Sequence, residues 1–207
     1  MDDDGLADFS SIQEATNSPL VADGDIIYVY NGTYDEQLVV NKTILLTGES
    51  KNATILGDIR ITSNKTTIQG FSIRGGVCLG SFLTHVYNVT IQENALLNGG
   101  IYTGSMPFPP VPFCNNTITL NSITNATYGI RVELGDYKII GNKLTGCSVG
   151  IRVGSNTTLL DNACIAQRNC DESRRSQQLT LDRHRHGTPN NNAKPTGEKQ
   201  QPKNLQS

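Results

Sequence analysis

Apolar and polar positions repeat along the central part of this chain at intervals of 20 to 27 residues. One seven-residue phrase occurs five times, and its second residue is an isoleucine or leucine at positions 68, 91, 118, 139 and 159. The copies are Thr67–Ile73, Thr90–Leu96, Thr117–Ile123, Lys138–Leu144 and Thr158–Cys164. Repeats of this length, built from strand-forming residues and asparagine, are typical of a β-solenoid.

A second apolar pattern repeats in step with the first. Short segments open with glycine or aspartate and then alternate apolar and variable residues, as half-buried strands do. They are 58–61, 76–79, 100–103, 129–132 and 150–153. Ile130 and Ile151 are 21 residues apart, like Ile118 and Ile139. Two strand types therefore repeat in phase, which predicts an all-β parallel β-helix of about six rungs.

The beginning of the chain predicts a cap followed by the first turns of the coil. Residues 8–18 favour a short helix, because Ser11 and Glu14 form a capping box and Pro19 follows. Strands are expected at 25–30, 37–40 and 43–46, separated by turns at Asn31-Gly32 and Asn41-Lys42. The predicted organisation is an N-terminal segment with its capping helix at 1–24, a β-helix at 25–165 and a tail at 166–207.

One asparagine stands at the same place in four copies of the phrase. Because stacked strands lie about 4.8 Å apart, identical positions face each other on successive turns. We expect an inward ladder in which each amide donates to the next and satisfies buried polar groups. In the first copy this place is taken by Phe71, so the ladder should start in the second copy. Its members are Asn94, Asn121, Asn142 and Asn162.

Two segments depart from the repeat. Residues 104–114 contain four prolines, which exclude a central strand and favour an extended excursion from one rung. From 167 onward the only large aliphatic residues are Leu179, Leu181 and Leu205, among Gln, Asn, Arg and Lys. Such a tail cannot bury enough apolar surface to order itself and is expected to be disordered. The abrupt end of the repeat suggests a fragment of a longer protein.

Composition narrows the class of partner. Residues 1–162 hold nine Lys and Arg against fifteen Asp and Glu, and residues 163–207 hold eight against four. The body is therefore acidic, which argues against nucleic acid as the main partner. The five cysteines have no C-x-x-C spacing, and the chain shows neither a signal peptide nor an apolar stretch long enough to span a membrane.

Eight N-x-S/T sequons make glycosylation a candidate modification. A solenoid also requires turns that lead into strands, and Asn-x-Thr suits such a turn, so the sequons have a structural explanation as well. The asparagines are Asn31, Asn41, Asn52, Asn64, Asn88, Asn115, Asn125 and Asn156.

The opening of the chain resembles a known superfamily. Residues 8–15, 24–29, 31–36 and 40–48 are similar to the start of right-handed parallel β-helix proteins, the pectin lyase-like superfamily. The best match is to its NosD-like and archaeal surface-protein branch, which implies a right-handed coil and an extracellular, cell-surface or periplasmic location. Catalytic motifs of the pectin-degrading members have no counterpart, and the acidic residues of the body form no stacked pair that would hold a metal.

The variable residue of the glycine-led strands gives a candidate binding surface. It is Arg60, Cys78, Tyr102, Arg131 and Arg152 on successive rungs, and it should point outward. Tyr102 offers a stacking surface, and the arginines offer hydrogen-bond donors to an acidic or neutral glycan. Two stacked arginines repel, and Glu133 is placed to supply the compensating charge. The alternative is a solvated face without a ligand.

The sequence therefore predicts a non-catalytic extracellular or cell-surface module that binds carbohydrate or a neighbouring protein and needs no cofactor. One alternative is a fragment of a polysaccharide lyase or pectinesterase-like enzyme. Another is a periplasmic accessory protein for copper, for which His184 and His186 in the tail would be weak ligands. Cys147 and Cys164 are expected to be buried small apolar residues, because no histidine is placed to activate them.

Overall fold

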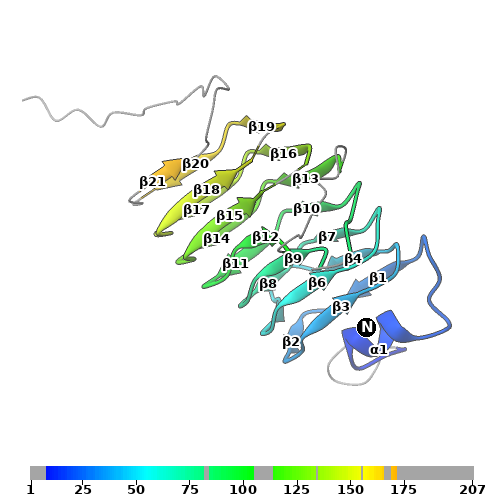
Figure 1. Cartoon of the computed structure of the whole chain (residues 1–207). Helices are drawn as coiled ribbons and strands as arrows, with labels where there is room; N and C mark the ends of the chain where they lie inside the picture. Colours follow the sequence, from blue (N-terminus) through cyan, green and yellow to red (C-terminus); the bar gives the residue numbers. More distant parts are fainter. Residues whose placement is uncertain are drawn as a thin grey trace, which may run out of the picture.

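The chain coils into a parallel β-solenoid with three strands in each turn (Figure 1). The computed structural model describes residues 8–81, 84–104, 114–133, 135–154, 156–165 and 169–171. Its three sheets contain seven strands each, and every pair within them is parallel. Six full turns carry the chain from the first strand to the seventh strand of the same sheet, which confirms the predicted all-β fold of about six rungs.

The strands of the three sheets alternate along the chain. The first sheet contains β1 (Ile26–Val29), β4 (Leu45–Gly48), β7 (Thr67–Gln69), β10 (Thr90–Gln92), β13 (Asn116–Thr119), β16 (Tyr137–Ile140) and β19 (Thr157–Leu160). The second contains β2 (Gly32–Tyr34), β5 (Ala53–Ile55), β8 (Ser72–Ile73), β11 (Ala95–Leu97), β14 (Ser122–Thr124), β17 (Lys143–Thr145) and β20 (Ala163–Ile165). The third contains β3 (Leu38–Val40), β6 (Ile59–Ile61), β9 (Val77–Leu79), β12 (Ile101–Thr103), β15 (Tyr128–Val132), β18 (Val149–Val153) and β21 (Asn169–Asp171).

The repeated phrase spans two of these strands. It forms a strand of the first sheet, a bend, and a strand of the second sheet, as β10 and β11 show. The sequence pattern predicted two strands in each turn and missed this division. For the same reason Gly32, expected in a turn, instead begins β2.

The interior is filled by stacked aliphatic side chains. Ile68, Ile91, Ile118 and Ile139 follow one another in the first sheet, and each is fully buried. Burial of such a side chain contributes about 1.5–3 kcal/mol, so these columns supply most of the driving force for coiling.

Four asparagine side chains point inward at the bend between the first and second sheets. The Nδ2 group of Asn94 donates to Oδ1 of Asn121 at 3.2 Å, and that of Asn121 donates to Oδ1 of Asn142 at 3.0 Å. Asn142 Nδ2 donates to Asn162 Oδ1 at 2.9 Å. Phe71 occupies the preceding turn, and its backbone N–H donates to Asn94 Oδ1. This is the arrangement that the aligned copies predict.

A fifth inward asparagine lies at a different corner. Asn116 is fully buried, its Oδ1 accepts from the Val89 N–H at 2.8 Å and its Nδ2 donates to the Val86 carbonyl at 3.0 Å. The sequence analysis missed this residue because it lies inside the sequon of Asn115 and outside the repeated phrase.

A short helix, α1 (Ile12–Asn17), covers the N-terminal end of the coil (Figure 1). Ile12 and Ala15 are buried in the common core. Ser11 is the N-cap and accepts from the Glu14 N–H at 3.2 Å, as predicted. The carboxylate of Glu36 also accepts from the N–H groups of Ile12 and Gln13, at 2.9 and 2.8 Å. This second cap ties α1 to the first turn.

The other end of the described chain extends further than expected. β21 pairs with β18, although residues 169–171 were assigned to the disordered tail. The third sheet therefore continues past the predicted boundary at residue 165. Residues 172–207, with His184 and His186, lie outside the described residues, as do residues 105–113 of the proline-rich excursion.

Candidate functional site

The predicted column of variable residues lies on the outer surface of the third sheet. The strand pairs place Arg60 beside Cys78, Cys78 beside Tyr102, and Tyr102 beside Arg131. Arg131 in turn pairs with Arg152. Five successive turns thus present these side chains in one row, which we call the outer column: Arg60, Cys78, Tyr102, Arg131 and Arg152.

Exposure differs along the outer column. Arg60 is exposed, Tyr102 has 36% of its surface exposed, and Arg131 and Arg152 are half-buried. Cys78 is only 7% exposed, so this member of the outer column is buried although it lies on the outer side of the sheet. Loss of solvation raises the pKa of the Cys78 thiol and also that of the neighbouring Tyr102 hydroxyl.

Cys78 interacts with neighbours from its own turn and from the preceding one. Its thiol donates to the Gly80 carbonyl at 3.5 Å, and it interacts with the side chains of Arg60 and Asp58. Asp58 is itself held in place, because its Oδ1 accepts from the Gly76 N–H at 2.6 Å. Cys78 therefore behaves as a buried small residue on the outside of the sheet, with little thiolate available for reaction.

The two stacked arginines have the compensating carboxylate that the sequence predicts. Arg131 forms an ion pair with Glu133, and their side chains are 42% and 48% exposed. The guanidinium carbon of Arg131 also lies 5.4 Å from the centre of the Tyr128 ring, a cation–π distance. Arg131, Tyr128 and Glu133 thus form one group of interacting side chains in this half of the outer column.

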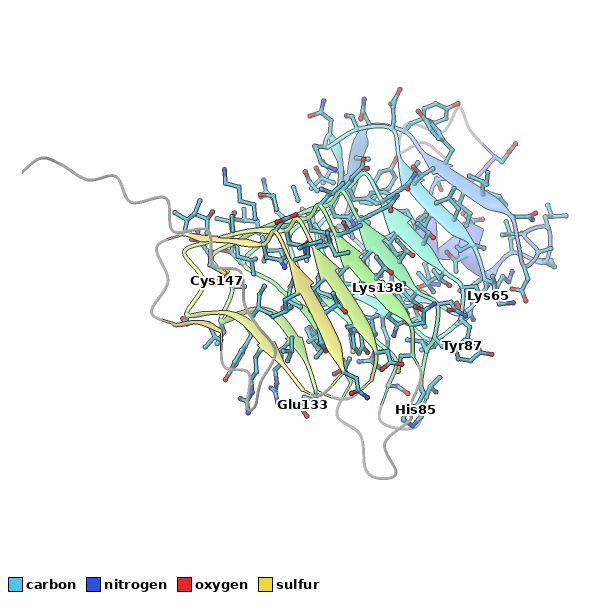
Figure 2. All side chains as sticks on the ribbon, turned by 90° about the horizontal axis from the view of Figure 1, so that it is seen from above. Lys65, His85, Tyr87, Glu133, Lys138 and Cys147 are labelled. Carbon is cyan, nitrogen blue, oxygen red and sulfur yellow. The ribbon has the colours of Figure 1, made fainter. Side chains whose placement is uncertain are left out.

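The sequon asparagines gather at the corners of the solenoid. Five of them, Asn41, Asn64, Asn88, Asn115 and Asn156, precede strands of the first sheet. We call this position the third-to-first corner; in Figure 2 Lys65, Tyr87 and Glu133 follow one another along this margin. Asn31 and Asn52 precede β2 and β5, and Asn125 follows β14. Seven of the eight are exposed, and Asn64 is half-buried.

Several of these asparagines have a conformational reason to be there. Asn88, Asn115, Asn125 and Asn156 have φ of 56°, 46°, 58° and 62°. Asparagine tolerates this left-handed region better than most residues, so a corner that needs it selects asparagine. The positive φ of these corners therefore explains part of the sequon pattern.

The described cysteines fall into two groups. Cys78, Cys114 and Cys147 are buried free thiols. Cys164 was expected to be a buried apolar residue, but it is half-buried and part of a disulfide.

Within the residues that the structure describes, no three His, Cys, Asp or Glu side chains come together in a way that would hold a metal ion. The described part of the chain likewise contains no helix with the length and apolar character needed to cross a membrane.

Fold and register together define the chain as a parallel β-solenoid with a polar outer column and sequon-bearing corners. No protein-family model matches the chain, and no solved structure matches it. The chain is 36% identical over 157 residues to a cell surface glycoprotein of Methanothermus fervidus. The similarity covers 70% of this chain and 26% of the relative, so the chain spans about a quarter of that protein's length.

Proposed function

We propose that this chain is a rigid β-solenoid module of a cell-surface glycoprotein. The observation that carries the proposal is the 36% identity to a cell surface glycoprotein over 157 residues, which include most of the solenoid repeat. A stack of regular turns suits such a role, because each turn adds length while its interior stays dry and hydrogen bonded.

Two features of the structure support an exported location. Seven sequon asparagines are exposed at corners, where an attached glycan projects into solvent without disturbing the core. Cys164 is part of a disulfide, and disulfides persist mainly in oxidising compartments outside the cytosol.

Protease treatment of intact cells tests the location. Cells of the source organism are exposed to a protease that cannot enter them, and the chain is followed with an antibody against the solenoid. We expect the signal to disappear while a cytosolic marker survives. A chain that remains intact until the cells are lysed would contradict a surface location.

The outer column is a second proposal, as a binding surface for carbohydrate or for a neighbouring surface protein. Its support is the group around Arg131, whose guanidinium contacts Glu133 and Tyr128 and whose neighbours in strand register are Tyr102 and Arg152. Aromatic rings and arginine forks at this spacing match the stacking and hydrogen-bonding needs of a sugar chain.

Glycan binding by the purified module tests the outer column. Arg131→Ala and Arg152→Ala are each expected to reduce retention on an array of acidic and neutral glycans about tenfold, the effect of losing one or two charge-assisted hydrogen bonds. Lys138→Ala, an exposed cation on the first sheet (Figure 2), is the matched control and should retain binding. Equal losses from all three variants would indicate non-specific charge attraction instead.

The enzyme and copper alternatives gain no specific observation from the described residues, and we do not propose them.

A further inference from the structure

Two sequon asparagines are hydrogen bonded to each other across consecutive turns. Asn88 and Asn115 are both exposed at the third-to-first corner, and the pairing of Thr90 with Thr117 two residues later puts them in register. The Nδ2 group of Asn115 donates to Oδ1 of Asn88 at 2.9 Å. The amide nitrogen of Asn115 is therefore engaged, whereas the bond uses only the oxygen of Asn88.

Toward the C-terminus this pair is separated from the next sequon; on the other side Asn64 lies one turn before Asn88 and one residue out of register with it. Asp136 occupies the next turn, because Tyr137 pairs with Asn116, and it begins no sequon. Asn156 follows one turn later, in register with Asp136. Asn156 is thus two turns, about 10 Å, from Asn115, and about three turns from Asn88. Among these three asparagines, only Asn88 and Asn115 compete for the same space.

The chemistry of N-glycosylation distinguishes the two partners. A bond forms between Nδ2 and the anomeric carbon of an oligosaccharide carried on a lipid phosphate, the bond from that carbon to the phosphate oxygen breaks, and Nδ2 loses one proton. The phosphate oxygen leaves with the bonding pair, and nothing is oxidised or reduced. The nitrogen of Asn115 already donates one of its two hydrogens to Asn88, so its amide is less free to turn toward the lipid carrier. A second glycan one turn away would also crowd the first at a spacing of about 4.8 Å.

We propose that Asn88 is the glycan acceptor of this pair and that its side-chain oxygen protects Asn115 from modification. The inference rests on the proposed role as a surface glycoprotein and adds which sequon of the corner is used. It also requires that the transfer acts on the folded corner, where the hydrogen bond exists.

Site occupancy measured by peptide mass spectrometry tests the proposal. The full chain is secreted from a host that glycosylates N-x-S/T sequons, and occupancy is measured at all eight sequons, with Asn88, Asn115 and Asn156 compared directly. Asn88 is expected to be occupied about two- to twelvefold more than Asn115, the ratio that one net hydrogen bond supports. Molecules modified at both should be rarer than the product of the two single occupancies.

Two variants separate the hydrogen bond from simple competition. Thr90→Val removes the sequon of Asn88 but keeps its side chain, so Asn115 should remain poorly occupied. Asn88→Gly keeps the positive φ and removes the accepting oxygen, so Asn115 should rise to the level of Asn156. Thr158→Val, which removes only the Asn156 sequon, should leave the ratio between Asn88 and Asn115 unchanged.

Different failures have different meanings. Equal occupancy of Asn88 and Asn115, with Asn156 occupied, overturns the protection and leaves the surface role intact. A rise of Asn115 in Thr90→Val overturns it too, because crowding alone would then account for the preference. Absence of glycan from all eight sequons overturns both this inference and the glycoprotein part of the proposed function.

Discussion

Replacement of Asn121 by alanine tests whether the asparagine ladder holds neighbouring turns together. The Asn121 side chain is 1% exposed. Its Oδ1 accepts from the backbone N–H and from Nδ2 of Asn94, and its Nδ2 donates to three oxygens, those of Ile91, Thr119 and the Asn142 side chain. Alanine removes all five bonds and cannot replace any of them.

The expected cost follows from that inventory. A net hydrogen bond is worth about 0.5–1.5 kcal/mol, and a buried donor left unpaired costs about 1–3 kcal/mol. The Asn94 N–H is such a donor, since Asn121 supplies its acceptor. Allowing for relaxation of the emptied site, we expect Asn121→Ala to lower the free energy of unfolding by about 3–5 kcal/mol.

Asn162 provides the matched comparison at the end of the ladder. It is half-buried and makes three side-chain hydrogen bonds, two from Asn142 and one to the Ile139 carbonyl. Asn162→Ala should therefore cost only about 1–2 kcal/mol. Asn121→Asp should be at least as harmful as alanine, because its carboxylate would face three oxygens that now accept hydrogen bonds.

Guanidinium unfolding followed by circular dichroism measures these differences. Because a solenoid is stabilised by contacts between adjacent turns, the Asn121 variants should also show a broader transition as the two halves begin to unfold separately. If Asn121→Ala and Asn162→Ala cost the same, the ladder is not what couples the central turns, and the reasoning fails.

Three further substitutions probe other parts of the coil. Glu36→Ala should cost about 1–2 kcal/mol and expose α1 to proteolysis, since three hydrogen bonds from the helix start end on this carboxylate; Glu36→Gln should lose less. Gly100→Ala should destabilise by about 1–3 kcal/mol in the same unfolding assay, because its Cβ would clash with the Tyr128 carbonyl oxygen. Burial raises the pKa of Tyr137, so the protonated hydroxyl contributes its full stability to the fold below about pH 10, and this stability is lost as the pH rises further. Tyr137→Phe should therefore reduce the fall of the free energy of unfolding with alkaline pH by about 1.4 kcal/mol per pH unit. An unchanged slope would refute the assignment.

The sequence predicted the parts of the fold that depend on repetition. A solenoid places equivalent residues above one another, so aligning copies of a phrase locates both the isoleucine columns and the ladder from Asn94 to Asn162. The register of the outer column, including Arg131 beside Arg152, follows from the same alignment.

Features that depend on contacts between different positions could not be predicted in this way. The environment of Cys78 depends on Arg60 and Asp58 of the preceding turn, and the second cap on α1 comes from Glu36, more than twenty residues away. Asn116 is the middle residue of the Asn115 sequon, so its inward, hydrogen-bonded position could not be recognised from the pattern. β21 has too few apolar residues to be recognised as a strand. In each case the repeat pattern does not show which side chains of other turns contact the residue.

An N-x-T sequence in a solenoid has two possible explanations, the backbone geometry of a corner and the attachment of a glycan. A corner with positive φ selects asparagine, and the outward position two residues later in a strand suits threonine, so the coil produces N-x-T without any glycan. At Asn64 the structural meaning dominates: its Oδ1 accepts from the Tyr87 N–H at 3.0 Å, and Thr66 is fully buried. At Asn156 both asparagine and threonine are exposed, with φ of 62° at the asparagine, so the corner is open to modification. We therefore expect the geometry of each corner, and not the count of sequons, to decide how many of these asparagines carry a glycan.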